Sequence, residues 1–289
     1  MRIASFQLQE RAHWGIVDGE HIIVAPADLP SDVLTLIALG DAAQILKRLR
    51  TNGSAQRLPL EAVELRAPIP RPRKNIICLG LNYAEHARES MAAKGREMML
   101  PEHPVVFTKN VTSVNGPFAD VTLDPRVTAT LDWEAELGFV IGRGGRHIPE
   151  ERALEHVFGY LVINDLTARD VQFRHKQFFL GKSLDGCAPM GPYLVTADEI
   201  PDPQTLDVKC WVNGTLKQSS NTSQQIFSIA HTIAVLSQIM TLEPGDIVST
   251  GTPDGVGFAR NPPEYLAVGD VVECEVSGVG RIRNRIVSA

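Results

Sequence analysis

Two glutamates, Glu134 and Glu136, stand two positions apart in residues 131–142, where acidic and apolar residues alternate. In a β-strand, residues two apart point to the same face, and their Cα atoms lie roughly 7 Å apart. Two carboxylates at that spacing can close around one cation, so both are candidate metal ligands. The simpler alternative is a polar strand face in contact with solvent. The other parity of the segment is apolar and consists of Trp133, Ala135, Leu137 and Phe139.

A third carboxylate, Asp165, follows the apolar run 158–163, which predicts a buried strand. A carboxylate at the end of a strand, next to irregular chain, is well placed to bind an ion. Asp165 could equally cap the following turn, because aspartate accepts hydrogen bonds from free backbone N–H groups. The sequence alone leaves both roles open.

His86 and Glu89 are three positions apart in a segment of helical composition, which follows a predicted strand at residues 75–80. On a helix this spacing places both side chains on one face. The carboxylate can then hold one tautomer of the imidazole and raise its basicity, so that the pair could transfer protons. The alternative is an ion pair on the helix surface, which would contribute little to stability.

Two glycine-containing segments suggest nucleotide binding, but their spacing excludes it. Gly181-Lys182-Ser183 would end a phosphate-binding loop only if a glycine stood five positions before Gly181, where the chain has Lys176. Residues 142–145 lack the G-x-G-x-x-G spacing. Residues 251–257 are different, because three glycines and a proline follow a predicted strand and could form either a tight turn or a rigid ligand-binding loop.

The first part of the chain predicts a hairpin and two helices. The dipeptide Asp18-Gly19 separates two apolar runs and suits the tight turn of a hairpin within residues 3–24. Ser31 is the expected N-cap of the first helix, and a second helix is expected over residues 42–52.

Three prolines, at positions 68, 70 and 72, predict an extended link, because each disfavours helix in the residue before it. We therefore expect a small N-terminal domain at residues 1–70 and a catalytic domain at residues 71–289. Residues 91–104 are polar and rich in methionine, and they could form a mobile lid or an ordinary surface loop. Residues 222–240 predict a helix with one apolar stripe.

Composition excludes several classes of protein. The chain has 289 residues, 44% hydrophobic and 21% charged, with no apolar run long enough to span a membrane. The basic cluster at residues 71–74 is too short for a nucleic-acid site, and the net charge is −6. The first residues lack the pattern of an export signal, so we expect a cytoplasmic protein. Four scattered cysteines without a C-x-x-C pair predict reduced thiols and no zinc site.

Five blocks of sequence, in order from about residue 75 to the C-terminus, resemble the fumarylacetoacetate hydrolase superfamily. The resemblance is to its acylpyruvase-like and 2-hydroxyhepta-2,4-diene-1,7-dioate isomerase-like branch. The blocks are residues 80–83 with His86 and Glu89, residues 132–137, residues 164–170, residues 181–183 with 188–192, and residues 251–257. Residues 183–187 depart from the version common in the family, which predicts a differently shaped pocket wall.

The resemblance implies an α+β fold, with a mixed β-sheet roll preceded by a small α+β N-terminal domain, and a homodimer. It implies that Glu134, Glu136 and Asp165 bind one Mg²⁺ or Mn²⁺ per subunit. It also implies that His86, Glu89 and Lys182 are catalytic. The substrate-binding residues that it implies are Arg169, Gln172 and Thr252.

The chemistry of these residues agrees with that assignment. Three carboxylates suit a hard divalent ion with positions left for water and for a 2-oxo acid, which can chelate through its carboxylate and its C2 oxygen. We expect a hydrolase that cleaves 2,4-dioxo acids such as acylpyruvates, releasing pyruvate or a derivative through a metal-bound enolate. The alternative on the same site is an oxaloacetate-type decarboxylase or a 2-hydroxy-diene-dioate isomerase. A third possibility is a non-enzymatic module in which the carboxylates hold a structural Ca²⁺.

Overall fold

The computed structural model describes residues 1–93, 95, 97 and 99–289. In this part of the chain the largest element is a 12-stranded sheet. Along its main path the strands are, in spatial order, β4 (Arg57–Pro59), β3 (His21–Val24), β2 (Arg11–Asp18), β1 (Arg2–Leu8), β14 (Ala188–Thr196), β12 (Val157–Asn164), β11 (Ala135–Ile141), β17 (Ile247–Ser249), β6 (Ile76–Gly80) and β7 (Val105–Lys109). Two further strands pair off this path, β5 (Glu64–Arg66) with β1 and β8 (Val114–Asn115) with β14.

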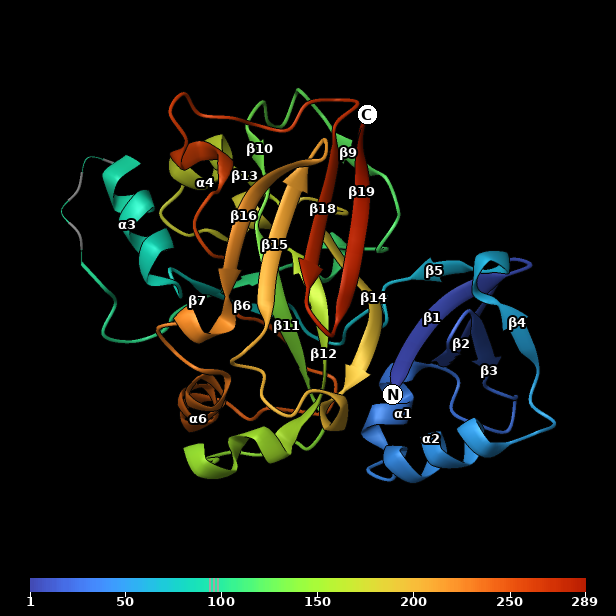
Figure 1. Cartoon of the computed structure of the whole chain (residues 1–289). Coiled ribbons are helices and arrows are strands. Elements are labelled where there is room, and N and C mark those ends of the chain that lie inside the picture. The colour runs from blue at the N-terminus through green and yellow to red at the C-terminus, as the bar shows by residue number, and fades with distance from the viewer. Residues whose placement is uncertain (94, 96, 98) are drawn as a thin grey trace.

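A five-stranded sheet packs in front of the middle of the large sheet (Figure 1). Its order is β16 (Thr215–Asn221), β15 (Asp207–Val212), β18 (Val271–Val276), β19 (Gly280–Ser288) and β9 (Val121–Leu123). A small third sheet joins β10 (Leu131–Asp132) to β13 (Thr167–Ala168). Because β17 with β6 and β19 with β9 are parallel pairs among antiparallel ones, the sheets are mixed, as predicted.

Helices lie around these sheets. The α-helices are α1 (Val33–Ala38), α2 (Ala42–Thr51), α3 (Ala84–Ala93), α4 (Arg169–Arg174), α5 (Phe179–Lys182) and α6 (Ile229–Ile239). The 3₁₀ turns are η1 (Leu60–Ala62), η2 (Val111–Ser113), η3 (Glu150–His156), η4 (Ala197–Glu199), η5 (Thr222–Gln224) and η6 (Gly257–Ala259). The α+β class is therefore confirmed. Among the helices of the described residues, none is both long and apolar enough to cross a membrane.

Strand β11 is buried on both faces, and this burial positions the acidic residues. Leu137 and Phe139 pack in one core with Val208 of β15 and Cys274 of β18. Val140, of the opposite parity, packs in a second core that includes residues of the N-terminal segment. Acidic residues at the start of β11 therefore cannot reach solvent on either face, and they need partners inside the protein.

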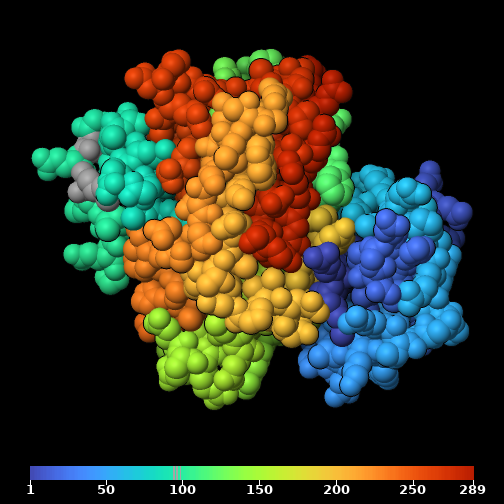
Figure 2. Space-filling model, viewed as in Figure 1, coloured from blue at the N-terminus to red at the C-terminus, as the bar shows by residue number. Residues whose placement is uncertain are grey.

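The N-terminal segment forms a lobe beside the larger body, shown in blue in Figure 2. The predicted hairpin is confirmed, with β2 and β3 joined through Gly19 at φ +61°. Strand β1 pairs with β14, with Ile3 opposite Leu194, so the large sheet continues from the lobe into the main body. The division into domains at residue 70 stays a prediction.

The predicted N-cap of the first helix was wrong by one residue. Asp32, and not Ser31, caps α1, because its Oδ1 accepts a hydrogen bond of 2.7 Å from the Thr35 N–H. The Ser31 hydroxyl donates to the other Asp32 oxygen at 2.9 Å. Ser31 therefore supports the cap from outside the helix. The second predicted helix is confirmed as α2.

The helix predicted over residues 222–240 is shorter than expected. Helix α6 begins only after Ser228, its N-cap, and ends at Ile239. The physical reason is Asn82, whose carbonyl accepts a hydrogen bond from the Ile226 N–H at 2.7 Å, while its side-chain oxygen accepts one from the Phe227 N–H at 2.8 Å. These backbone groups are held by another segment and cannot join the helix.

The lid predicted at residues 91–104 is only partly covered by the structure. Residues 91–93 belong to the end of α3. Lys94, Arg96 and Met98 lie outside the described residues, so the lid stays a prediction. The four cysteines, Cys78, Cys187, Cys210 and Cys274, are buried and free, in agreement with the prediction of reduced thiols.

Candidate active site

Three carboxylates meet inside the protein where β11 begins and β12 ends. Glu134 precedes β11, Glu136 is its second residue, and Asp165 directly follows β12. The antiparallel pairing sets Ala135 opposite Asn164, which brings the two strand ends together. One oxygen from each carboxylate lies within 4.8 Å of the other two, and all three residues are buried. The alternative of a solvated polar face is therefore wrong for this segment.

Basic side chains contact two of these carboxylates. The Lys182 Nζ lies 2.6 Å from Oε2 of Glu134 and 2.7 Å from Oδ2 of Asp165. Arg169 Nη2 forms an ion pair of 2.6 Å with Oε1 of Glu134, and Lys109 Nζ forms one of 2.8 Å with Oδ1 of Asp165. Burial alone would raise the pKa of Glu134, but Lys182 and Arg169 lower it to about 2. Glu134 is therefore held ionised.

Glu136 is held by neutral donors. Its Oε2 accepts hydrogen bonds from the Ser249 hydroxyl and, at 2.9 Å, from the Gly251 N–H. Burial, followed by the nearby charges of Asp165 and Glu134, raises the pKa of Glu136 well above its ordinary value. A divalent cation would relieve this repulsion, and an all-oxygen donor set suits a hard ion. The three carboxylates therefore fit Mg²⁺ or Mn²⁺.

Lys182 contacts two of the three carboxylates that would hold such an ion. Burial alone would lower the pKa of its ammonium, but Asp165 and Glu134 raise it to about 12. The ammonium group and a divalent ion would compete for Oε2 of Glu134 and Oδ2 of Asp165. Lys182 also lines the cavity, and its predicted catalytic role stays a prediction.

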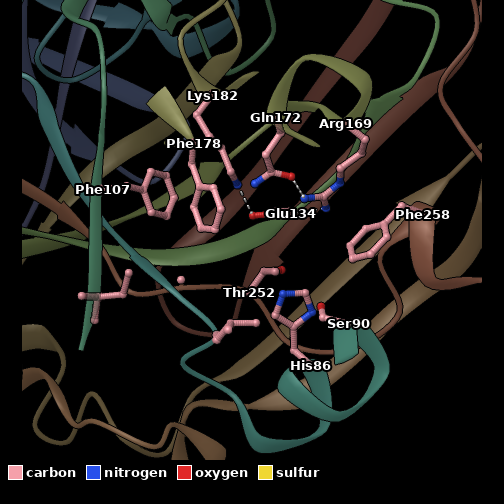
Figure 3. A pocket seen from close by; sticks show the side chains of 13 residues that line it. His86, Ser90, Phe107, Glu134, Arg169, Gln172, Phe178, Lys182, Thr252 and Phe258 are labelled. Atoms are coloured by element: carbon pink, nitrogen blue, oxygen red, sulfur yellow. Dashed lines mark hydrogen bonds and ion pairs between the residues drawn. The ribbon is translucent and has the colours of Figure 1, made fainter. Parts of the chain in front are cut away.

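His86 and Glu89 form the predicted pair on α3. His86 Nδ1 lies 3.0 Å from Oε1 of Glu89, and the imidazole points into the cavity (Figure 3). The His86 side chain is only 8% exposed, so the alternative of a surface ion pair is wrong. Oε2 of Glu89 accepts a hydrogen bond of 2.9 Å from the Gly255 N–H. The pair is therefore fixed from the loop at residues 251–257 as well as from its own helix.

Arg169, Gln172 and Thr252 all line the same cavity. Arg169 Nη1 donates to Oε1 of Gln172 at 3.0 Å, so the amide nitrogen of Gln172 is the group left for a ligand (Figure 3). The Thr252 hydroxyl donates to the Ala135 carbonyl at 3.0 Å and accepts from the Gln218 amide at 2.8 Å. Arg169 and Thr252 thus shape the cavity while their polar groups already have protein partners.

Asp132 connects this cavity to the loop at residues 251–257, a role that the sequence did not suggest. Its Oδ1 accepts from the Gly257 N–H at 2.7 Å, and its Oδ2 accepts from Arg169 Nε at 2.8 Å and from the Phe258 N–H at 3.0 Å. Burial raises the pKa of Asp132. Its parity with Glu134 and Glu136 was the one available signal.

The sequence did not predict several other residues of the site. Lys109 could have been suspected, because it is the one charged residue of a strand that begins with three apolar residues. The hydroxyls and aromatic rings carried no such signal, since they reach the site only through the tertiary fold. These residues are Ser90, Phe107, Phe178 and Phe258 around the cavity and Ser249 behind Glu136.

The fold is that of the fumarylacetoacetate hydrolase superfamily. The family model described as fumarylacetoacetate (FAA) hydrolase C-terminal matches residues 75–287, and the chain belongs to this family. The resemblance seen in the sequence is confirmed.

Relatives along the whole chain are enzymes. Oxaloacetate tautomerase YisK of Bacillus subtilis (strain 168) is 43% identical over 304 aligned positions, covering 99% of this chain and 100% of that protein. The structure of a fumarylacetoacetate hydrolase from Exiguobacterium antarcticum has a TM-score of 0.86 at 38% identity, with 100% of both chains covered. That of maleylpyruvate hydrolase from Sphingobium sp. SYK-6, in complex with manganese(II) and pyruvate, has a TM-score of 0.79 at 31% identity, with 100% of both chains covered.

Proposed function

We propose that this chain is a divalent-metal-dependent tautomerase that interconverts the keto and enol forms of oxaloacetate or a closely similar 2-oxo diacid. The observation that carries the proposal is the His86–Glu89 pair, which shares one cavity with the carboxylate cluster. The name of the Bacillus subtilis relative, 43% identical over 99% of this chain, supports the choice of substrate.

Tautomerisation moves a proton from C3 of the substrate to the oxygen on C2. Glu89, as a carboxylate, can only accept a hydrogen bond, so Nδ1 of His86 carries the proton between them and Nε2 keeps a lone pair. Nε2 removes the proton from C3, the electron pair of that bond forms the C2–C3 double bond, and the π pair of the C2 carbonyl moves onto its oxygen. His86 then delivers the proton to the C2 oxygen. Glu89 stabilises the imidazolium that exists between these two transfers.

An ion at Glu134, Glu136 and Asp165 would supply a Lewis acid that favours negative charge on the C2 oxygen. Lys182 and the free amide nitrogen of Gln172 lie on the same cavity wall, where they can bind carboxylate oxygens of a diacid. Three phenylalanine rings, Phe107, Phe178 and Phe258, line the rest of the cavity and strengthen these interactions by lowering the local dielectric.

Hydrolysis of 2,4-dioxo acids, expected from the sequence, is the second candidate. The same histidine could deprotonate a water that attacks C4, and the maleylpyruvate hydrolase at TM-score 0.79 favours this reaction. Decarboxylation of oxaloacetate is less well supported, because loss of CO₂ needs no base and leaves His86 and Glu89 without a role.

The test follows oxaloacetate with Mg²⁺ or Mn²⁺ by the ultraviolet absorbance of the enol and by solvent deuterium entering C3. We expect both to change faster than without enzyme, with total oxaloacetate conserved and with activity lost in excess chelator. Release of pyruvate from oxaloacetate would support the decarboxylase instead. In a parallel assay with an acylpyruvate as substrate, loss of its absorbance would support the hydrolase. Absence of all three activities would overturn the proposal.

We also propose that the protein is a homodimer and lies in the cytoplasm, as expected from the sequence. Light scattering of the purified protein tests the dimer. If the protein is a monomer and is fully active, the dimer is not part of the proposed function, and the proposed chemistry is unaffected.

A further inference from the structure

Each of the three carboxylates has one oxygen that contacts a group outside the cluster, through an ion pair in Asp165 and Glu134 and through hydrogen bonds in Glu136. We propose that Lys109 and Ser249 lock Asp165 and Glu136 so that each offers a single oxygen to the ion, and that this makes the site selective for Mg²⁺ and Mn²⁺ over Ca²⁺. The inference rests on the proposed function in one respect, because it requires that a divalent ion binds at this cluster.

Lys109 is the clearest example of a group that keeps an ion away from one carboxylate oxygen. It is fully buried at the end of β7, where its Nζ lies 2.8 Å from Oδ1 of Asp165 and donates to the Leu166 carbonyl at 3.0 Å. The carbonyl contact fixes the ammonium group next to Oδ1. A cation that approached both oxygens of Asp165 would meet this fixed positive charge, so only Oδ2, where it would compete with the Lys182 ammonium, remains for an ion.

The other two carboxylates are arranged in the same way. Oε2 of Glu136 accepts hydrogen bonds from Ser249 and Gly251, which leaves Oε1. Oε1 of Glu134 is paired with Arg169 at 2.6 Å, and Oε2, which contacts the Lys182 ammonium at 2.6 Å, is the oxygen for which an ion would compete. Each of the three carboxylates therefore offers only one oxygen to an ion.

Single oxygens discriminate between the ions. Mg²⁺ demands octahedral geometry with short bonds, and three protein oxygens leave three positions for water and a chelating oxo acid. Ca²⁺ takes six to eight oxygens at longer distances and commonly uses both oxygens of a carboxylate. A site that prevents two-oxygen binding by its carboxylates thus favours the smaller ions.

Lys182 provides the matched control. It contacts the same Asp165 through Oδ2, at 2.7 Å, but it lies on the oxygen that the ion uses and locks nothing. Removing either lysine charge strengthens the attraction for any divalent ion, and this effect is the same for Mn²⁺ and Ca²⁺. The ratio of the two affinities therefore isolates the lock from the charge.

The experiment titrates metal-free protein with Mn²⁺, follows free Mn²⁺ by electron paramagnetic resonance, and then adds Ca²⁺ as competitor. We expect the wild type to prefer Mn²⁺, and Lys109→Met to lose roughly tenfold of that preference, the lower end of the usual effect of residues behind metal ligands. Lys182→Met should bind both ions more tightly with the preference unchanged. Ser249→Ala removes one of the two donors to Oε2 of Glu136 without removing a charge, and it should also reduce the preference, by less than Lys109→Met.

The outcomes separate the inference from the proposed function. A wild type that binds no Mn²⁺ at this cluster overturns both. A wild type that binds Mn²⁺, with an unchanged preference in the variants, overturns the lock alone. Should Lys109→Met not fold, as judged by circular dichroism, the result for Ser249→Ala decides the question.

Discussion

Glu89 accepts a hydrogen bond of 2.9 Å from the backbone N–H of Gly255, and this contact ties the His86–Glu89 pair to a loop 166 residues further along the chain. The second oxygen of Glu89 lies 3.0 Å from His86 Nδ1. The loop that carries Thr252 into the cavity thus also fixes the orientation of the imidazole. The His86–Glu89 pair and this wall of the cavity are therefore held together by hydrogen bonds.

Replacement of the pair should separate proton transfer from metal binding. We expect His86→Asn to lower the turnover of oxaloacetate tautomerisation by roughly 10²- to 10⁴-fold, the usual contribution of a general base. Glu89→Gln should reduce turnover less, because the imidazole remains. Mn²⁺ affinity should change little in both, since the described hydrogen bonds of the two side chains are to each other and to the Gly255 N–H and not to the three carboxylates. Wild-type turnover in His86→Asn would show that another group moves the proton.

Gly255→Ala tests the connection between the loop and the pair. A Cβ at this position would lie 2.2 Å from the Lys217 carbonyl oxygen, at φ +96°. The loop must shift and move its N–H away from Glu89, so we expect a loss of turnover of up to about 10²-fold, as for small misplacements of catalytic groups.

Gly214→Ala is the control for the backbone strain of that variant. Gly214 has φ +76°, but a Cβ there meets nothing within 4 Å. It should lose stability to a similar backbone strain, about 1–2 kcal/mol, while it keeps full turnover. Equal turnover in the two variants would mean that the contact between Gly255 and Glu89 does not orient His86.

Asp32 gives a prediction about stability. Asp32→Ala should lower the free energy of unfolding by about 1 kcal/mol, the usual value of an N-cap, and Ser31→Ala should cost less. Burial raises the pKa of Asp32, but hydrogen bonds from Thr35 and Ser31 outweigh burial and lower it below 3.8. The stabilisation is therefore present above pH 3.8 and is lost as pH falls through the lower, folded-state pKa. Urea unfolding at neutral and acid pH measures it, and a larger loss in Ser31→Ala would contradict the assigned cap.

This N-cap also shows where sequence-based prediction ends. Ser31 and Asp32 are both good caps, and only the position of the Thr35 N–H distinguishes them. Helix α6 shows a stronger case, because its start depends on Asn82, a residue more than a hundred positions earlier. Apolar periodicity cannot reveal that a backbone N–H donates a hydrogen bond to a distant residue and is not available to the helix.

The candidate site divides in the same way. Glu134 and Glu136, like His86 and Glu89, are neighbours in the chain, so their spacing already predicts a shared face. Asp165 could be predicted as a strand-end carboxylate. Lys109 and Ser249 contact these carboxylates only through the pairing of β6, β7, β11 and β17, so no local pattern contains them.

Glu136→Gln should have opposite effects on the metal-free and the metal-loaded protein. Burial and the charges of Asp165 and Glu134 disfavour an ionised Glu136, so a neutral amide should leave the metal-free protein at least as stable as wild type. The amide oxygen can still accept from Ser249 and Gly251. Thermal unfolding without metal measures this, and a strongly destabilised variant would mean that the ionised carboxylate stabilises the fold.

Addition of Mn²⁺ should reverse that order. An ion present at a hundred times its dissociation constant should stabilise the wild type by about 2.7 kcal/mol, because it binds only the folded state. Glu136→Gln lacks one ligand oxygen of full charge, so its unfolding temperature should change much less, and excess chelator should remove the difference. An equal increase in both proteins would place the ion away from Glu136 and would contradict a site built from the three carboxylates.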